Sequence, residues 1–323
     1  MPHAIRIHET GGPEVLKWEP VEIGEPGPGE VRLAQHAAGL NYIDVYHRTG
    51  LYPQPLPFTP GVEGAGVVES VGPDVDNVKP GERVAYAGPI GGYAEVRTIA
   101  ADRLVKLPDE IGFDQAAAMM LQGMTARMLL RSVFPVAAGD MILIHAAAGG
   151  VGLILCQWAA ALGAIVIGTV STDDKAELAR AHGCHHPIVY TRQDFVAEVA
   201  RITAGAKLAV VYDSVGRDTF MQSLDCLRPR GLMVSFGNAS GPVDPFSPNL
   251  LAQKGSLFLT RPTLFSYIAS RAELEASAAE LFKMVGSGQV RVEVKQRFAL
   301  ADAANAHRAL EARATTGSTV LTV

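Results

Sequence analysis

The stretch DMILIHAAAGGVGLILCQWAAALGAIVIGTVSTDDK, residues Asp140 to Lys175, decides the fold of this chain. Its first apolar run, Met141 to His145, is long enough for a buried strand and too short for a helix. Small residues follow, and a helix-compatible run from Leu153 to Leu162 then ends at a glycine. A second strand-like run, Ala164 to Val170, completes a strand–turn–helix–strand unit of about 30 residues. This is the setting in which a glycine-rich turn can bind a dinucleotide.

The glycines of the turn have separate tasks in such a site. Gly149 and Gly150 allow the backbone to come close to a pyrophosphate, and Gly152 allows the helix to pack tightly on the strand. The helix N-terminus offers unpaired N–H groups and the positive end of its dipole to the phosphates. Against the pattern G-x-G-x-x-G, Ala147 replaces the first glycine. With both strands and the helix in place, a nucleotide site is favoured over an ordinary tight turn.

The end of the second strand indicates which nucleotide binds. An NAD site carries Asp or Glu there, about 20 residues after the turn, to hold the ribose hydroxyls. Here the position is Val170, followed by Ser171 and Thr172, with Lys175 beyond. Hydroxyls and a lysine suit a 2′-phosphate, so the sequence favours NADPH. The acidic pair Asp173–Asp174 could reach a ribose instead, although acids in the first turn of a helix also match its dipole.

Composition limits the class of protein. A length of 323 residues predicts two domains, and 48% hydrophobic with 19% charged residues describes an ordinary globular chain. A net charge of −5 argues against nucleic acid or an anionic membrane as partner. The N-terminal stretch lacks the apolar run of a signal peptide, and no segment reaches about 18 consecutive apolar residues, so we expect a cytoplasmic protein. The 3 cysteines support neither a disulfide framework nor a metal site.

The two ends of the chain differ in pattern from its middle. Residues 1 to about 120 carry short β-type runs between Gly/Pro turns such as Gly24–Gly29, which predicts a barrel-like β domain. After the central unit, strand-like runs such as Leu208–Asp213 alternate with helical runs such as Thr219–Leu227, which predicts a doubly wound parallel sheet. The last run, Ser318–Val323, is a strand candidate that could return to the first domain.

Several separated motifs resemble one superfamily. The turn H-A-A-A-G-G-V-G, the run V-V-Y-D-S-V-G (Val210–Gly216) and the run G-L-M-V-S-F-G-N (Gly231–Asn238) resemble medium-chain dehydrogenases/reductases, and within them the bacterial NADPH:quinone oxidoreductases of the zeta-crystallin type. The resemblance covers essentially the whole chain. It implies an α/β fold, with a Rossmann doubly wound parallel sheet plus a GroES-like β-barrel catalytic domain. The implied divisions are residues 1–120 (catalytic), 121–262 (NADPH-binding) and 263–323 (return segment), in a homodimer.

The resemblance has an informative departure at the zinc site of the alcohol-dehydrogenase branch. Asn41 stands where the zinc enzymes place a cysteine, and Val62 stands where they place a histidine. The lobe of four cysteines that binds their structural zinc is missing. An amide and a valine are not zinc ligands, so we expect no metal and direct hydride transfer from NADPH to a quinone.

Hydride addition to a quinone creates an oxyanion that needs hydrogen-bond donors. Asn41, Tyr46 and Tyr52 are the candidate catalytic donors, although Asn41 could be a turn residue and Tyr52 a loop aromatic packed by prolines. Cofactor contacts are expected from residues that match the family or lie at strand ends. They are Asn41, Gly149, Gly150, Val151, Gly152, Ser171, Thr172, Lys175, Tyr190, Ser214, Phe236 and Gly237, with Arg313 as a weaker candidate that could serve a helix C-terminus instead.

Two alternatives stay open at this point. Reduction of an activated C=C bond, as in enone or enoyl reductases of the same superfamily, needs the same hydride donor and a positioned acid that protonates carbon. A non-enzymatic role as an RNA-binding or crystallin-like structural protein is the other alternative. The acidic net charge and the lack of a basic stripe with interleaved aromatics weigh against RNA.

Overall fold

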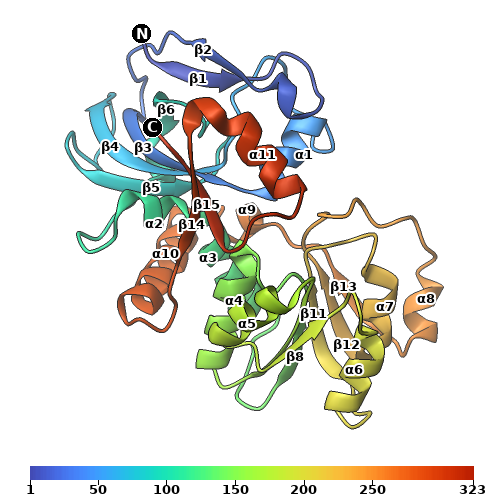
Figure 1. Ribbon diagram of the computed structural model, residues 1–323. Coiled ribbons are helices and arrows are strands. Elements are labelled where there is room, and N and C mark those ends of the chain that lie inside the picture. Colours follow the sequence, from blue (N-terminus) through green and yellow to red (C-terminus); the bar gives the residue numbers. More distant parts are fainter. The chain divides into compact units, whose positions relative to one another are not determined.

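The computed structural model describes all residues from Met1 to Val323, and they form two compact units. The first unit contains both ends of the chain and the second most of its middle (Figure 1). The first unit consists of Met1–Met124, Ile268–Gly286 and Val292–Val323, and the second of Thr125–Tyr267 and Ser287–Arg291. The domain limits expected at residues 120 and 262 stay predictions. No helix combines the length and the apolar character needed to cross a membrane.

The second unit is built on a six-stranded sheet in which every strand pairing is parallel. The order across the sheet is β10 (His186–Val189), β9 (Ile165–Val170), β8 (Met141–Ile144), β11 (Leu208–Asp213), β12 (Leu227–Ser235) and β13 (Phe258–Thr260). The chain therefore enters at the centre and winds outward first to one side and then to the other. This confirms the predicted doubly wound parallel sheet, whose ligands bind at the carboxyl ends of the strands where the order reverses.

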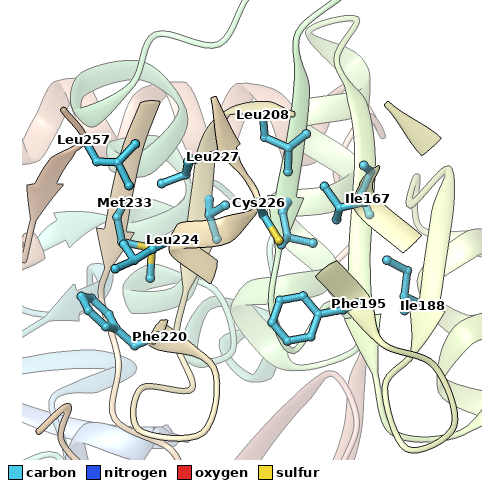
Figure 2. Close-up of a cluster of buried hydrophobic side chains, with 13 residues drawn as sticks. Ile167, Ile188, Phe195, Leu208, Phe220, Leu224, Cys226, Leu227, Met233 and Leu257 are labelled. Carbon is cyan, nitrogen blue, oxygen red and sulfur yellow. The ribbon is translucent and has the colours of Figure 1, made fainter. Parts of the chain in front are cut away.

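Five helices connect these strands, and a short one follows the last strand. They are α4 (Gly150–Ala161), α5 (Asp173–Ala181), α6 (Phe195–Ile202), α7 (Phe220–Asp225), α8 (Asn249–Gln253) and the short α9 (Leu264–Tyr267). Of these, α4 to α7 bury apolar side chains. Figure 2 shows the strand residues Ile167 and Met233 in one cluster with Phe195 and Phe220 from the helices, and all are buried. Burying each such side chain contributes about 1.5–3 kcal/mol, so this core holds the strand ends in fixed positions.

The first unit is built on a seven-stranded sheet around the long strand β3 (Glu30–Leu40). This strand pairs antiparallel with β4 (Glu63–Val71), β6 (Val96–Ala100) and β15 (Ser318–Thr322). The prediction that the last strand returns to the first domain is therefore confirmed. The remaining strands are β5 (Arg83–Ala87), β7 (Val105–Lys106) and β14 (Val294–Ala299), with β1 (His3–Arg6) and β2 (Lys17–Pro20) in a separate pair.

A helix at residues 42–49 departs from the pattern of short strands and turns that the sequence predicts for the first part of the chain. α1 (Tyr42–Thr49) follows β3 directly. Asn41 precedes it, Asp44 accepts the backbone N–H of Asn41 at 2.9 Å, and Gly50 ends the helix with φ of 80°. An Asn cap, an acid three residues later and a terminal glycine are helix signals that the aromatic composition of the segment obscures. The other helices that contribute to the first unit are α2 (Phe113–Ala117), the first part of α3 (Met120–Arg127, up to Met124), α10 (Arg271–Gly286) and α11 (Ala303–Glu311).

Candidate active site

The turn between β8 and α4 depends on close backbone contact. A Cβ atom on Gly152 would lie 2.2 Å from the carbonyl O of Ala146, and one on Gly168 of β9 would lie 2.6 Å from Cβ of Ala147. The residue with left-handed backbone is Ala146, with φ of 53°. Ala147 stands where the pattern has its first glycine, and it packs against Gly168. The left-handed backbone conformation of the turn is provided by the preceding residue, Ala146. Turn, strand and helix are held together at distances that side chains would prevent.

The N-terminus of α4 is a ready site for an anion. Gly149 is the cap residue and provides no side-chain acceptor, and the first turn contains no acid. The first intrahelical bond is donated by the N–H of Leu153 to the carbonyl O of Gly149 (2.9 Å), so the N–H groups of Gly150, Val151 and Gly152 have no acceptor within the helix. A 12-residue helix also directs the positive end of its dipole to this turn. Both features fit a diphosphate.

The structure brings Ser171 and Tyr190 together at the end of β9. The N–H of Tyr190 donates to the carbonyl O of Val170 (3.1 Å), and the hydroxyl of Thr191 donates to the carbonyl O of Ser171 (3.0 Å). Tyr190 is 40% exposed, so its phenol is accessible to a ligand. Val170, in the position of the ribose-binding acid, is buried.

Lys175 and Thr172 lie in the first turn of α5, which begins beside this strand end. Thr172 caps the helix, and its hydroxyl oxygen accepts the backbone N–H of Lys175 (3.3 Å). Asp173 is bound by both terminal nitrogens of Arg192, whose hydrogen bond lowers the pKa of that carboxyl. One of the two acids that could have reached a ribose is therefore already paired. The strand end fits a 2′-phosphate better than a ribose diol.

The loops after β11 and β12 place the other predicted cofactor residues in contact with each other. The N–H of Phe236 donates to the carbonyl O of Asp213 (2.7 Å), and a Cβ atom on Gly237 would lie 2.4 Å from the carbonyl O of Ser214. The buried carboxylate of Asp213 accepts the N–H of Gly216 (3.1 Å) and fixes this loop. Ser214, Phe236 and Gly237 thus share one backbone cluster at the carboxyl edge of the sheet, where such folds bind ligands.

Arg313 belongs to the first unit, as does Asn41, whereas the other predicted cofactor residues belong to the second. It is exposed and lies in the loop between α11 and β15 with φ of 56°. Its charge opposes the effect of burial on the pKa of Tyr42, which burial raises. Arg313 is therefore a surface cation next to the start of α1.

Asn41 joins β3 to α1, and its amide is hydrogen-bonded at both ends. Nδ2 donates to Glu63 Oε2 (2.6 Å), and Oδ1 accepts from Gln122 Nε2 (3.1 Å). The side chain is 8% exposed, which leaves a small accessible area. The sequence predicts neither Glu63 nor Gln122 as site residues. The sequence does carry one indication that Glu63 is a site residue. It is a carboxylate among the small apolar residues of V-E-G-A-G, and carboxylates are rarely buried unless they are paired or functional.

Tyr46 and Tyr52 lie against each other. Their rings meet edge to face with centroids 5.2 Å apart, and the N–H of Tyr52 donates to the carbonyl O of Tyr46 (3.0 Å). Tyr46 is buried on α1, whereas Tyr52 follows the helix and is partly exposed. His47 also contacts the ring of Tyr52, with centroids 6.2 Å apart. Burial lowers the pKa of His47 to about 4, so its imidazole is neutral at pH 7.

Two buried carboxyls dominate the electrostatics of this region. Burial raises the pKa of Glu63 to about 8 and the pKa of Asp44 to about 7. Each is partly compensated by donors: the N–H of Leu121 donates to Glu63 Oε1 (2.8 Å), and the phenol of Tyr93 donates to Asp44 Oδ2 (2.9 Å). Their charges oppose each other, since the charge of Asp44 raises the pKa of Glu63 further. Both groups change charge close to neutral pH.

The C-terminal segment fixes α1 from its other side. Arg48 is 1% exposed and forms two hydrogen bonds to the carboxylate of Glu311 on α11, at 2.9 and 2.7 Å. A third contact of Arg48, at 3.0 Å, joins its guanidinium to Nδ1 of His307. A bidentate Arg–carboxylate pair of this kind is geometrically specific. The helix that carries Tyr46 is therefore bound to a segment more than 250 residues later in the chain.

Comparisons with known proteins agree with these two halves. One family model, the alcohol dehydrogenase GroES-like domain, matches residues 27–109, and another, zinc-binding dehydrogenase, matches residues 150–283. A quinone oxidoreductase of Pseudomonas aeruginosa is 55% identical over 323 residues, with 99% of each chain covered. The chain belongs to the quinone oxidoreductase family of medium-chain dehydrogenases/reductases. The predicted fold class, a Rossmann sheet plus a GroES-like domain, is confirmed.

Two further relatives bear on cofactor and substrate. The crystal structure of Escherichia coli quinone oxidoreductase complexed with NADPH matches with a TM-score of 0.98 and 48% identity, over 99% of this chain and 100% of that one. A 2-haloacrylate reductase of a Burkholderia species is 48% identical over 324 residues, with 98% of this chain and 97% of the relative covered. One family therefore includes proteins named for quinones and for an activated alkene.

Asn41 and Val62 occupy the two positions at which the family resemblance implies the ligands of the zinc enzymes. Asn41 provides an amide that Glu63 and Gln122 already engage, and Val62 provides a buried apolar side chain. Nowhere does the structure place three or more His, Cys, Asp or Glu side chains in a group that could hold a metal ion. The donor set here is chemically unsuited to zinc.

Proposed function

We propose that the chain is an NADPH-dependent quinone reductase in which hydride passes directly to the quinone without a metal. The full-length match to quinone oxidoreductases carries this proposal. The reaction balances as quinone plus NADPH plus one proton giving hydroquinone plus NADP⁺. NADPH, when bound, supplies the hydride from its nicotinamide ring, while the residues of this chain bind, orient and stabilise charge.

The second unit provides the cofactor site in this proposal. The N-terminus of α4, at Gly149–Gly152, holds the diphosphate, and Lys175 pairs with the 2′-phosphate beside Ser171 and Tyr190. The residues after β11 and β12, Ser214 and Phe236–Gly237, line the carboxyl edge of the sheet. Thr172 contributes mainly as the cap of α5. Asn41 and Arg313 complete the set proposed from the family resemblance.

The first unit provides the groups for the quinone. Hydride addition leaves negative charge on a quinone oxygen, and the phenol of Tyr52 and the amide N–H of Asn41 are its donors, with Tyr46 supporting Tyr52. Because the neutral His47 holds no excess proton, the proton that completes the hydroquinone comes from solvent or from Tyr52. Hydride transfer to a reactive quinone depends mainly on proximity, so no single side chain is indispensable.

Reduction of an activated C=C bond is the second candidate, favoured by the likeness to the 2-haloacrylate reductase. It requires a proton at carbon, which an obligatory acid must deliver. With His47 neutral, the phenol of Tyr52, which lies beside that imidazole, is the candidate for that acid. The experiment is NADPH oxidation with 1,4-benzoquinone compared with 2-chloroacrylate under identical conditions. Faster turnover of the quinone supports the proposed function, and faster turnover of the alkene overturns it.

We further propose a homodimer in the cytoplasm. The edge strand β13 exposes Phe258 (61%) and Leu259 (38%), which suit pairing with a second copy. All three cysteines are buried free thiols, as is usual for a reducing compartment. Sedimentation of the wild-type protein and of Phe258→Asp tests the dimer: a shift of the variant to monomer supports it, and a monomeric wild-type protein contradicts it.

A further inference from the structure

A chain of side-chain hydrogen bonds runs through the first unit to the amide of Asn41. The hydroxyl of Ser318 on β15 donates to Gln122 Oε1 on α3 (2.8 Å), and Gln122 Nε2 donates to Asn41 Oδ1 (3.1 Å). Asn41 Nδ2 in turn donates to Glu63 Oε2 on β4 (2.6 Å). All of these side chains are buried, and they come from three elements of the fold and from the junction between β3 and α1.

Glu63 gives this chain its direction. Both of its carboxylate oxygens accept hydrogen bonds, one from Asn41 and the other from the N–H of Leu121 (2.8 Å). An acceptor at Glu63 requires the nitrogen of the Asn41 amide to face it, and Asn41 Oδ1 must then face Gln122. If the Asn41 amide turned over, its nitrogen would face the Gln122 donor, and above about pH 8, where Glu63 is ionised, its oxygen would also face a carboxylate. Each such mismatch in a buried site is costly, so the contact with Gln122 selects one orientation and the ionised Glu63 reinforces it.

The surrounding backbone leaves room for the contact between Glu63 and Asn41, and hydrogen bonds also fix the backbone of Asn41. A Cβ atom on Gly39 would lie 2.3 Å from Glu63 Oε2, so only glycine at that position lets the carboxylate reach Asn41. The backbone N–H of Asn41 donates to Asp44 Oδ2 (2.9 Å), which also accepts from the phenol of Tyr93. Both the backbone and the side chain of Asn41 are therefore held. An amide nitrogen carries two hydrogens, and the proposed function assigns the second Nδ2–H to a ligand.

We propose that Gln122 and Ser318 are positioning residues for the reaction, which act by fixing the orientation in which Asn41 presents its remaining N–H. This inference rests on the proposed role of Asn41 as a donor to the substrate or cofactor. Gln122 suits the task because one amide both donates to Asn41 and accepts from Ser318. Ser318 contributes less, because its single proton is shared between Gln122 and the carbonyl O of Ala118 (3.1 Å).

A double-mutant cycle tests the proposal, with kcat/KM for 1,4-benzoquinone and the Kd of NADPH measured for each protein. Gln122→Leu is expected to lower kcat/KM about tenfold, similar to Asn41→Ala, because the amide loses its fixed orientation. The double variant should lie within about twofold of the weaker single variant, since Gln122 acts only through Asn41. A hundredfold loss in the double variant, the product expected of independent effects, would overturn the proposal.

Gln35→Leu is the matched control. Gln35 is also a buried glutamine of the first unit with both ends of its amide bonded, to the carbonyl O of Gly92 and to the phenol of Tyr86, but not to Asn41. We expect it to lower the melting temperature as Gln122→Leu does while kcat/KM stays within about twofold of wild type. An equal loss of kcat/KM in both variants would mean that any buried amide matters, and the proposal fails.

Two substitutions that remove only a hydroxyl group test the same proposal if a leucine variant does not fold. Ser318→Ala removes the first donor of the chain and should lower kcat/KM about two- to threefold. Thr319→Ala removes the adjacent hydroxyl, which bonds to Gln296 instead, and should have no effect on turnover. The reverse order of effects overturns the proposal.

The same measurements separate this proposal from the proposed function. Wild-type protein that reduces no quinone contradicts the proposed function, and the cycle is then decided by NADPH affinity alone. If Asn41→Ala changes neither turnover nor NADPH affinity, the role of Asn41 and the positioning chain fail together. Loss in Asn41→Ala with wild-type behaviour in Gln122→Leu overturns the positioning chain only.

Discussion

The nucleotide turn of the second unit and the Asn41 region of the first unit are built in different ways. Residues 140–175 form one local unit, in which strand, turn, helix and strand follow each other along the chain. Asn41, by contrast, is held by Glu63 and Gln122 and, through Gln122, by Ser318. Gln122 and Ser318 are 196 residues apart in the chain. A site formed by consecutive residues can be predicted from the sequence, whereas a site assembled by long-range hydrogen bonds cannot. The nucleotide turn depends on backbone shape, and the Asn41 region depends on side-chain partners.

The largest expected effect tests the claim that backbone shape controls the nucleotide turn. Gly152→Ala should destabilise the protein by about 3 kcal/mol and abolish tight NADPH binding, because its Cβ would meet the carbonyl O of Ala146 at 2.2 Å. Gly24→Ala is the control, since a Cβ atom there would have no atom within 4 Å and the residue belongs to the first unit, outside the nucleotide turn. Thermal unfolding and nucleotide fluorescence measure both. Equal effects of the two variants would show that close approach is not what the glycines provide.

The next effect concerns charge at the end of β9. Lys175→Ala should weaken NADPH binding by about 1–3 kcal/mol, the range of a charge-assisted bond to phosphate, and leave NADH binding nearly unchanged. Arg180→Ala removes an equal charge from the same helix, in its last turn, and should change neither affinity. Titration of each variant with both nucleotides decides the matter. An equal loss for NADPH and NADH would place Lys175 outside the phosphate site.

A smaller effect is expected in the first unit, where donors assist a reaction that proximity already favours. Tyr52→Phe should lower kcat/KM for 1,4-benzoquinone about tenfold, or roughly 1.4 kcal/mol, because one donor to a partly solvated oxyanion is lost. Tyr267→Phe, a partly buried tyrosine of the second unit, serves as the control with unchanged kinetics. Complete loss of quinone reduction in folded Tyr52→Phe would identify an obligatory proton donor and favour the alkene reductase.

The smallest effect is the pH dependence of stability that the buried carboxyl of Glu63 gives to the first unit. Burial raises the pKa of Glu63 from 4.5 to about 8, so the folded state favours the protonated form. Its contribution to stability is therefore present below the unfolded pKa and is lost as pH rises through about 8. Glu63→Gln should flatten the fall in melting temperature over this range, whatever constant offset its own mismatched amide causes.

Glu69→Gln on the same strand is the control for that slope. Glu69 is exposed and pairs with Arg32 at the surface, so its removal should leave the pH dependence of the melting temperature unchanged. Identical slopes in the wild type and Glu63→Gln would contradict the raised pKa.

The sequence predicts the fold of the second unit better than it predicts the partners of Asn41 in the first unit. The strands and helices of the second unit are predictable because period and turn chemistry are local, and the order of the sheet follows from alternation. The pattern of short strands and turns does not predict helix α1, although Asn41, Asp44 and Gly50 mark its ends. Glu63 and Gln122 could not be assigned as partners of Asn41, because no local rule pairs residues 41, 63 and 122. Their meeting depends on the packing of β4 and α3 against the end of β3.

The preference between nucleotides tests the account most directly. We measure kcat/KM of the wild-type protein for NADPH and for NADH with 1,4-benzoquinone as the acceptor. With Val170 in place of an acid, Asp173 paired to Arg192, and Lys175 at the start of α5, the account predicts at least about a tenfold preference for NADPH. Equal values, or a preference for NADH, would contradict it.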